Sequence, residues 1–438
     1  MDGLAKFNDA RDWFFENRFG LFVHWGLYAI KGWHEQEIWR WPVSREDYAE
    51  YASQFNPVRF DANAWLDAAA AAGMDYVVFT TKHIDGFCNW DSAHTDFKIT
   101  NTSFGRDVLK ELSDACQHRG VPLCLYYSIP DMHHPNYPHA GRPYEYANPL
   151  EGDEPNVHQY LAYVEAQARE LLTNYGPIHG WWWDANVIEH VDESFHDMIH
   201  ELQPQAVINN RGFGRGDFKT PERDWDNSVN AMVKFEKPTE ANTSIGLISW
   251  SYKPDEDYYS DWHLQHSVAK ILAKGGNYLL NVGPQPDGAF SGYSQALLSR
   301  MGSWFKRVRE AFCNVEGCSD LTSNDKILLT RKGDTLYAVL HKPPVTTSVR
   351  LKPIDTEPRS VTLLNTGQPI EYVINRIPGY GPGVEAKPFL RLLNVPVNEL
   401  AGQVLVLKIE FAPGEVAQFS GGHQGQGTER EFSADAYE

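Results

Sequence analysis

The sequence has 438 residues, of which 42% are hydrophobic and 22% are charged, a composition typical of soluble proteins with folded domains. Its 39 Lys and Arg stand against 58 Asp and Glu. The formal net charge is therefore −19, which makes nucleic acid a poor partner because phosphate backbones repel an acidic chain. No stretch approaches the roughly 18 apolar residues of a membrane span, so we predict no membrane partner.

The first roughly 310 residues alternate short apolar runs with longer amphipathic segments, which is the pattern of repeated strand and helix units. In the first long helix, Asp61 is placed to cap the start and Gly73 to end it. The predicted strands are 19–23, 76–81, 122–127, 180–183, 206–209 and 277–281, and the predicted helices are 61–72, 107–118, 157–175, 192–202, 261–274 and 295–312.

Alternating strands and helices predict an α/β fold with a parallel sheet. The number of units and the total length favour a (β/α)8-like barrel over a doubly wound sheet, and we assign it to residues 1–315. Short strands separated by turns then predict a C-terminal antiparallel β-sandwich over residues 320–413. Residues 414–438 are rich in Gly, Gln and Glu and predict a disordered tail. All 14 Trp lie at or before Trp304, which suggests that the chemistry belongs to the first domain.

The cysteines and the first residues bear on cellular location. Five Cys at irregular spacing do not form a disulfide framework, and no pair has zinc-finger spacing. The sequence begins without the apolar segment of a signal peptide. Both features predict a cytoplasmic protein, although a secreted chain trimmed of its export signal would look the same.

Polar residues follow six of the predicted strands. In a parallel barrel, catalytic groups collect where the strands end at the carboxyl face. Any single one of these residues is more simply interpreted as a loop cap or a hydrogen-bonded core histidine, but six polar strand ends beside aromatic residues favour one common site. They are His24, His83 with Asp85, Ser128, Asp184, Arg211 and Asn281.

The strongest local feature is Asp184, which follows three consecutive tryptophans. Burial beside the indoles raises the pKa of a carboxyl group, whereas a nearby cation lowers it, and Arg211 is a candidate for that cation. The simple interpretation is an Asp that caps the following segment. The functional one is a nucleophile or base in an aromatic pocket.

Aromatic rings pack against the apolar faces of sugars, and the segment from Trp33 to Trp41 mixes indoles with charge too closely for a fully buried run. Hydrolysis of a glycosidic bond generally needs two carboxyl groups, which lie about 5–5.5 Å apart when one acts as a nucleophile. Asp184 is the first candidate. Spacing alone leaves the second open among Glu35, Glu37, Asp85, Glu236, Glu240, Asp255 and Glu256.

Two other kinds of site compete with a glycosidase. A zinc site would draw on His24, His83, Asp85, His133 and His134, but the sequence contains neither His-x-His nor His-Glu-x-x-His. A serine hydrolase is weaker still, because no Gly-x-Ser-x-Gly turn follows a strand.

Several ordered segments resemble glycoside hydrolase family 29, the α-L-fucosidases. The resemblance covers roughly Trp13 to Gly317. It rests on Phe19-Gly-Leu-Phe-Val-His-Trp-Gly26, Phe55-Asn-Pro57, Thr81-Lys-His-Ile-Asp-Gly-Phe87, Trp90-Asp-Ser92, Tyr126-Tyr-Ser128, Trp182-Trp-Asp184, Val207-Ile-Asn-Asn-Arg211, Gly275-Gly-Asn-Tyr-Leu-Leu-Asn-Val-Gly-Pro284 and Asp287-Gly288.

This resemblance implies a barrel followed by a β-sandwich and an enzyme that removes terminal α-L-fucose from oligosaccharides or glycoconjugates with retention of configuration. It implies neither a metal nor an organic cofactor, and it leaves the oligomeric state open. The matching positions make Asp184 the nucleophile and Glu240 the acid/base, with Glu37 as the fallback. The predicted sugar-binding residues are His24, Glu37, Trp39, His83, Tyr127, Trp182, Arg211 and Trp250.

Two departures from the family pattern bear on the substrate. Ile84 stands where the family usually has a second histidine, and Met132 stands where an aromatic residue is common. The loss of one hydrogen bond to a sugar hydroxyl costs roughly 0.5–1.5 kcal/mol. Two alternatives therefore remain: a related retaining glycosidase for another sugar such as an α-L-galactoside, and a catalytically silent glycan-binding protein.

Overall fold

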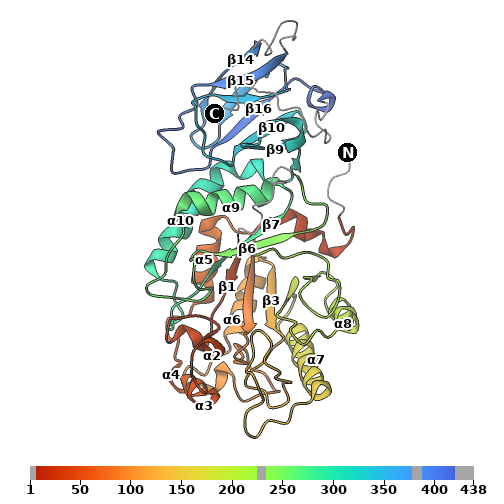
Figure 1. Ribbon diagram of the computed structural model, residues 1–438, viewed down its shortest axis with the longest axis vertical. Helices are drawn as coiled ribbons and strands as arrows, with labels where there is room; N and C mark the ends of the chain where they lie inside the picture. Colours follow the sequence, from red (N-terminus) through yellow and green to blue (C-terminus); the bar gives the residue numbers. More distant parts are fainter. Residues whose placement is uncertain (1–5, 224–232, 377–386, 420–438) are drawn as a thin grey trace.

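The computed structural model describes residues 6–223, 233–376 and 387–419. A barrel domain lies at one end of the elongated molecule and a β-sandwich at the other, with α9 (Asp261–Ala273) and α10 (Gly292–Val308) between them (Figure 1). The predicted α/β barrel followed by an antiparallel sandwich is confirmed.

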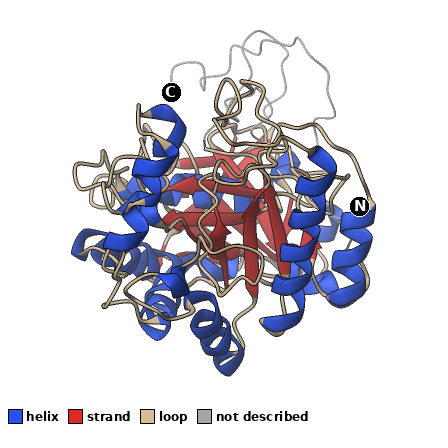
Figure 2. Cartoon of the chain, turned by 90° about the horizontal axis from the view of Figure 1, so that it is seen from below, coloured by secondary structure: helices blue, strands red, loops and turns tan. Residues whose placement is uncertain are grey.

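Seven parallel strands form the curled sheet of the barrel, in the spatial order β5-β4-β3-β2-β1-β7-β6. Seen along the molecule, these strands lie at the centre and the helices surround them (Figure 2). The strands are β1 (Phe19–Val23), β2 (Tyr76–Lys82), β3 (Leu123–Ser128), β4 (Gly180–Asp184), β5 (Val207–Ile208), β6 (Glu240–Ser244) and β7 (Asn277–Val282).

Two helices, α5 (Ala62–Ala72) and α6 (Val108–Arg119), begin and end at the capping residues of the sequence. In α5, the Asp61 carboxylate accepts hydrogen bonds from the first free backbone N–H groups, and Gly73 ends the helix in the left-handed conformation. The same pair of devices, Asp107 and Gly120, bounds α6. The remaining barrel-domain helices are α1 (Trp13–Glu16), α2 (Glu37–Arg40), α3 (Arg45–Ala49), α4 (Tyr51–Gln54), α7 (Val157–Asn174) and α8 (Ser194–Leu202).

The eighth position of the barrel is filled by the segment 218–222, which lies between β5 and β6. It is joined to its neighbours only by isolated parallel bridges: Asn209 with Phe218, Lys219 with Thr239, and Glu222 with Asn242. We call this segment the seam. The predicted eightfold arrangement is therefore closed by a segment with sparse backbone pairing rather than by a regular strand.

Successive strand residues face opposite sides, and this alternation divides the aromatic residues of the barrel. Trp181 and Trp183 pack in the large core between strands and helices, whereas Trp182 belongs to a separate apolar cluster with Phe22 and Tyr126 inside the barrel. The strand direction also carries Asp184, two residues after Trp182, to the interior side at the carboxyl end of β4.

The C-terminal domain packs a six-stranded sheet against a three-stranded one around its own apolar core. It is held to the barrel by Trp304 of α10, which donates to the Val404 carbonyl, and by Gln265 of α9, which accepts from the Val404 N–H. Its strands are β8 (Glu316–Gly317), β9 (Ile327–Lys332), β10 (Thr335–Leu340), β11 (Val349–Leu351), β12 (Ser360–Leu363), β13 (Gln368–Pro369), β14 (Glu371–Arg376), β15 (Pro388–Leu393) and β16 (Val406–Glu410).

The prediction of a disordered tail does not hold for residues 414–419. A short 3-10 helix, Val416–Gln418, lies there, and Val416 is buried in the sandwich core because an apolar side chain interrupts the polar sequence. Residues 420–438 of the predicted tail lie outside the described residues.

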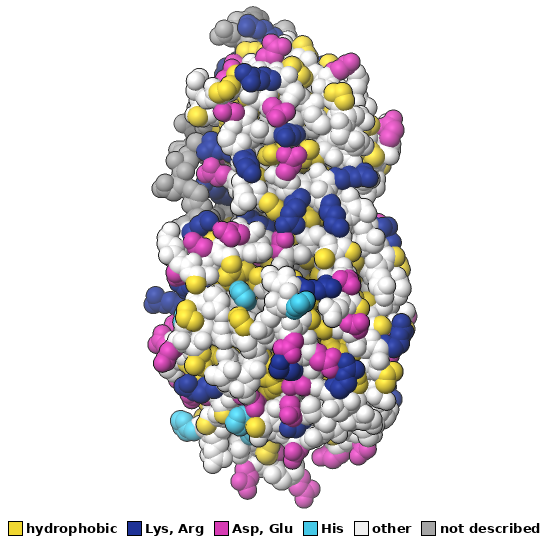
Figure 3. Space-filling model, turned by 180° about the vertical axis from the view of Figure 1, so that it is seen from behind, with side chains coloured by type: hydrophobic (Ala, Val, Ile, Leu, Met, Phe, Trp, Pro, Cys, Tyr) yellow, Lys and Arg dark blue, Asp and Glu magenta, His cyan; other side chains and the backbone are white. Residues whose placement is uncertain are grey.

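Acidic and basic side chains are interspersed over the face of the molecule shown in Figure 3, so on this face the net charge is not gathered into one patch. Within the described ranges, none of the helices is both long and apolar enough to cross a lipid bilayer.

Candidate active site

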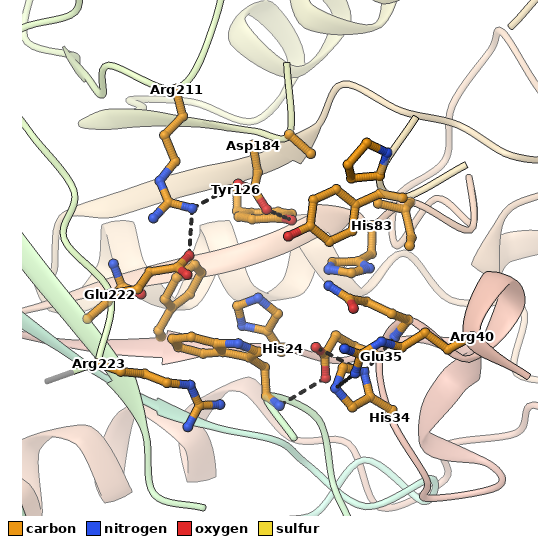
Figure 4. A pocket seen from close by; sticks show the side chains of 18 of the residues that line it. His24, His34, Glu35, Arg40, His83, Tyr126, Asp184, Arg211, Glu222 and Arg223 are labelled. Carbon is orange, nitrogen blue, oxygen red and sulfur yellow. Dashed lines mark hydrogen bonds and ion pairs between the residues drawn. The ribbon is translucent and has the colours of Figure 1, made fainter. Parts of the chain in front are cut away.

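One pocket of about 430 Å³ opens at the carboxyl end of the barrel strands. Its walls combine aromatic rings with ionisable groups that reach it from β1, β3 and β4 and from the loops that follow β1, β2, β5 and β6 (Figure 4). The sequence-predicted residues that line it are His24, Trp39, His83, Trp182, Asp184, Arg211 and Trp250.

Two donors, one from β3 and one from the loop after β5, hold the Asp184 carboxylate. The Tyr126 hydroxyl of β3 donates to Oδ2 at 2.7 Å, and Nη1 of Arg211 donates to Oδ1 at 3.1 Å. About a quarter of the Asp184 side chain remains exposed, so the carboxylate is oriented and still accessible from the pocket.

Arg211 links Asp184 to a second carboxylate, Glu222 of the seam. The same Nη1 atom lies 2.5 Å from Oε1 of Glu222, so the two carboxylate oxygens cannot be farther apart than the sum of the two distances (Figure 4). Thr220 holds the guanidinium through its hydroxyl and its carbonyl. Burial lowers the pKa of Arg211, but the charges of Asp184 and Glu222 outweigh this effect and raise it above its ordinary value.

Two histidines line the wall of the pocket in their neutral form. Burial lowers the pKa of His24 to about 4, and its Nδ1 lies 2.7 Å from the Asn281 side-chain oxygen. A neutral ring that donates from Nδ1 keeps Nε2 as an acceptor. Burial, together with the neighbouring His24, also lowers the pKa of His83 well below its ordinary value, and its ring stacks on Tyr126.

Glu35 supplies a third carboxylate to the pocket. Its side chain is almost fully buried, and Oε2 accepts hydrogen bonds from the Ser249 hydroxyl and the Trp250 N–H. Oε1 lies 3.2 Å from Nδ1 of His34 and accepts no well-aligned hydrogen bond from the described residues. Oε2 is therefore held by two donors, whereas Oε1 is buried without an aligned donor among the described residues.

Three sequence-predicted residues do not line the pocket. Glu240 is the first residue of β6, four residues, or about 13 Å of extended chain, before the carboxyl end of that strand. Glu37 is buried beside the pocket and accepts from the Tyr51 hydroxyl. Tyr127 faces the surrounding helices, where it contacts Gln167 and Lys82, because alternation along β3 turns Tyr126 inward instead.

Sequence reasoning missed Tyr126 and Glu222 as site residues. The signal for Tyr126 was the strand period itself, since Trp182 and Tyr126 are paired neighbours in the register of β3 and β4. Glu222 had no such signal, because the seam is short, contains Pro221 and shows neither helical nor strand periodicity.

The residues of the competing zinc hypothesis do not converge. His133 stacks on Phe97, the ring of His134 lies tilted against that of Tyr163, and Asp85 accepts from the Tyr48 hydroxyl. In the part of the chain that the structure describes, no three His, Cys, Asp or Glu side chains form a potential metal-binding group.

The family model for α-L-fucosidases matches residues 2–310 of this sequence. The chain belongs to the α-L-fucosidase family. The match spans the barrel domain, including both Asp184 and the seam.

Solved fucosidase structures are similar to this chain over more than nine-tenths of its length. The α-L-fucosidase isoenzyme 1 of Paenibacillus thiaminolyticus is 31% identical, with a TM-score of 0.77 over 92% of this chain and 100% of that one. A Bacteroides thetaiotaomicron α-L-fucosidase, trapped as a covalent intermediate with 2-fluoro-fucosyl fluoride, is 27% identical, with a TM-score of 0.77 over 94% and 97% of the two chains. The tissue α-L-fucosidase of Bos taurus is 27% identical over 83% of this chain and 82% of its own length.

Proposed function

We propose that this fucosidase-family protein hydrolyses terminal α-L-fucosides with retention, with Asp184 as the nucleophile and Glu222 as the acid/base. The observation that carries this assignment is the guanidinium nitrogen of Arg211 that both carboxylates share. Its two contacts limit the separation of the oxygens to less than the about 6.5–9.5 Å of inverting glycosidases, and a retaining pair needs about 5–5.5 Å. The covalent intermediate of the Bacteroides relative agrees with retention.

The reaction has two displacements. In the first, an oxygen of Asp184 bonds to the anomeric carbon while the bond from that carbon to the leaving oxygen breaks, and Glu222 gives its proton to the leaving group. In the second, Glu222 takes a proton from water, the water oxygen bonds to the anomeric carbon, and the ester bond to Asp184 breaks. Fucose leaves with the α configuration and Glu222 is protonated again.

Arg211 keeps the charge of this trio constant. The first step requires an ionised Asp184 and a protonated Glu222, which together with the Arg211 cation carry no net charge. After it, Asp184 is a neutral ester and Glu222 is a carboxylate paired with the same cation. The seam thus supports catalysis because Thr220 holds the Arg211 cation between two carboxyl groups, one of which becomes neutral as the other becomes ionised. Little charge therefore has to be created in the partly dry pocket.

The pocket supports binding of a single terminal sugar. Its floor is closed by the packed ring of Trp182, with His24 and Trp250 at the walls. We assign hydroxyl recognition to Nε2 of His24 and to the Glu35 side chain, and apolar contact to the indoles. Glu222, with 44% of its side chain exposed, lies closer to solvent than Asp184, where a leaving group departs.

The direct test is hydrolysis of an aryl α-L-fucoside, followed by NMR of the first-formed sugar. We expect turnover, with α-L-fucose appearing before mutarotation. Ile84, which is buried in the pocket wall, motivates a parallel assay of the α-L-galactoside, which differs at C6. Faster turnover of the galactoside would reassign the sugar. Saturable fucose binding without turnover would indicate a silent binding protein, and first-formed β-L-fucose would exclude retention.

Tyr126 and Tyr127 form a matched pair of test sites. Tyr126→Phe removes the hydroxyl that donates to Asp184, and a hydrogen bond to a charged group contributes about 1.5–3 kcal/mol. We expect kcat/KM for the aryl fucoside to fall by about 10- to 100-fold at unchanged Tm. Tyr127→Phe should lower the Tm and leave kcat/KM nearly unchanged, because the described hydrogen-bond partners of its hydroxyl are Lys82 and Gln167, neither of which lines the pocket. Equal activities of the two variants would contradict the proposed orientation of Asp184.

A further inference from the structure

We propose that Glu240 is a positioning residue that fixes the indole ring of Trp182, from beneath the pocket, in the orientation that forms the pocket floor. This inference rests on the proposed function for the role of Trp182 in binding the sugar. It gives Glu240 a role different from proton transfer to the substrate.

The Glu240 carboxyl makes one hydrogen bond with each oxygen. Oε1 accepts from Nε1 of Trp182 at 2.9 Å, and Oε2 accepts from the Tyr76 hydroxyl at 2.6 Å. These contacts join the start of β6 to β4 and β2 across the barrel interior. A Trp182 ring turned over about its Cβ–Cγ bond would point Nε1 away from this acceptor, so the carboxyl selects one of the two ring orientations.

In the described part of the chain, the indole N–H of Trp182 donates to Glu240 alone. Glu240 is 2% exposed and lies among the side chains that fill the barrel interior, including Phe14, Cys124 and Leu279. Among the described residues it forms no ion pair. A buried carboxyl group without a cation is costly, and here its compensation consists of two neutral donors, one of which belongs to a pocket residue.

On its pocket side, the same indole lies against Arg211 and Tyr126, the two residues that donate to Asp184. The Arg211 guanidinium lies 4.9 Å from the centre of the Trp182 ring, and Tyr126 stacks beside that ring at 5.9 Å. Rotation of the indole would therefore disturb the sugar-contact surface and the support of Arg211 at once. A buried polar residue with a purely structural role would not be linked to the pocket in this way.

The test compares two substitutions of Glu240 in two backgrounds. Glu240→Gln keeps an oxygen for Nε1 of Trp182 and an N–H group for Tyr76, so we expect kcat/KM for an aryl α-L-fucoside within about threefold of wild type. Glu240→Leu removes both partners, and we expect kcat/KM about tenfold lower with a matching rise in the inhibition constant of fucose. In a Trp182→Phe background, which has no Nε1 donor, Glu240→Leu should cost less than twofold further.

A spectroscopic measurement decides the matter if Glu240→Leu does not fold. Burial raises the pKa of Glu240 to about 7, although the hydrogen bonds from Tyr76 and Trp182 lower it. Near-UV absorbance of wild type should therefore show a tryptophan change with a midpoint near pH 7 that Glu240→Gln lacks. Other ionisable groups do not explain a difference between wild type and Glu240→Gln. Burial raises the pKa values of the neighbouring Tyr76 and Cys124 well above their ordinary values. Asp85, whose pKa burial also raises, is present in both proteins and would contribute equally to both titrations.

Three results would overturn this role: wild-type kcat/KM in Glu240→Leu, the same tenfold loss in the Trp182→Phe background, or an identical absorbance change in Glu240→Gln. Loss of activity in Glu240→Gln comparable to loss of a catalytic acid would instead assign proton transfer to Glu240. Absence of turnover in wild type would refute the proposed function, whereas the absorbance titration tests the Glu240–Trp182 link independently.

Discussion

Asp184→Ala should lower kcat for an aryl α-L-fucoside by about 10⁴- to 10⁶-fold, because it removes the atom that bonds to the anomeric carbon in both displacements. The fold should be retained, since the carboxylate lies at the end of β4 and 24% of its side chain is exposed. The measurement is steady-state release of the aryl alcohol, with the Tm recorded for each protein.

Azide identifies the role of Asp184 by the product that it forms. In Asp184→Ala, azide in the vacated space attacks from the face that the nucleophile used, so the expected product is β-L-fucosyl azide. Asp197→Asn, which changes an exposed carboxylate on α8, is the matched control and should keep wild-type kcat. Substantial fucosidase activity in Asp184→Ala without azide would assign the nucleophile to another residue.

Glu222→Ala should reduce kcat/KM by about 10²- to 10⁴-fold for substrates whose leaving group needs a proton, such as a fucosylated disaccharide. For a dinitrophenyl fucoside, which leaves without protonation, the first step should be nearly unaffected. A burst of released phenol should then precede slow hydrolysis of the ester on Asp184. Stopped-flow absorbance measures the burst and the steady state in one experiment.

The azide product separates Glu222 from Asp184. In Glu222→Ala, azide replaces the water of the second step and attacks the opposite face of the intermediate, so α-L-fucosyl azide is expected. Glu201→Gln, an exposed change on α8, is the control. A β product, or equal losses for both leaving groups, would contradict the acid/base assignment of Glu222.

The sequence was sufficient for the elements whose physical signals are local. Asp61 and Gly73 bound their helix as predicted, and the apolar runs became buried strands. β6 escaped prediction because its residues, Glu-Ala-Asn-Thr-Ser, are mostly polar yet all buried. Their side chains find partners across the barrel, as Glu240 does with Tyr76 and Trp182, and such long-range compensation leaves no periodic pattern.

The candidate site shows the same division between local signals, which the sequence contains, and long-range placement, which it does not. Asp184, His24 and Arg211 end or follow strands, and the barrel rule brings them to one pocket. The choice between Tyr126 and Tyr127 depended on which residue of β3 faces inward, a one-residue shift of register. The choice between Glu240 and Glu222 depended on how far along the barrel axis each carboxyl group lies from the pocket. The sequence alone does not contain this distance.

The strand that carries Asp184 and the seam that carries Glu222 differ in how well they would tolerate insertions. Asp184 belongs to a strand paired on both sides, where an inserted residue would turn Trp182 and Asp184 to the wrong face. Glu222 lies in the seam, which is joined to β6 and the residue before it by isolated bridges at Lys219 and Glu222 and to the residue after β5 by one at Phe218, so an insertion there would disturb fewer pairs than one in β4. In the proposed mechanism, the residue that bonds to the sugar therefore lies in the regular strand ladder, and the residue that meets the leaving group lies in the seam. Changes of aglycone preference should arise by remodelling the seam while the fucose-binding half stays intact.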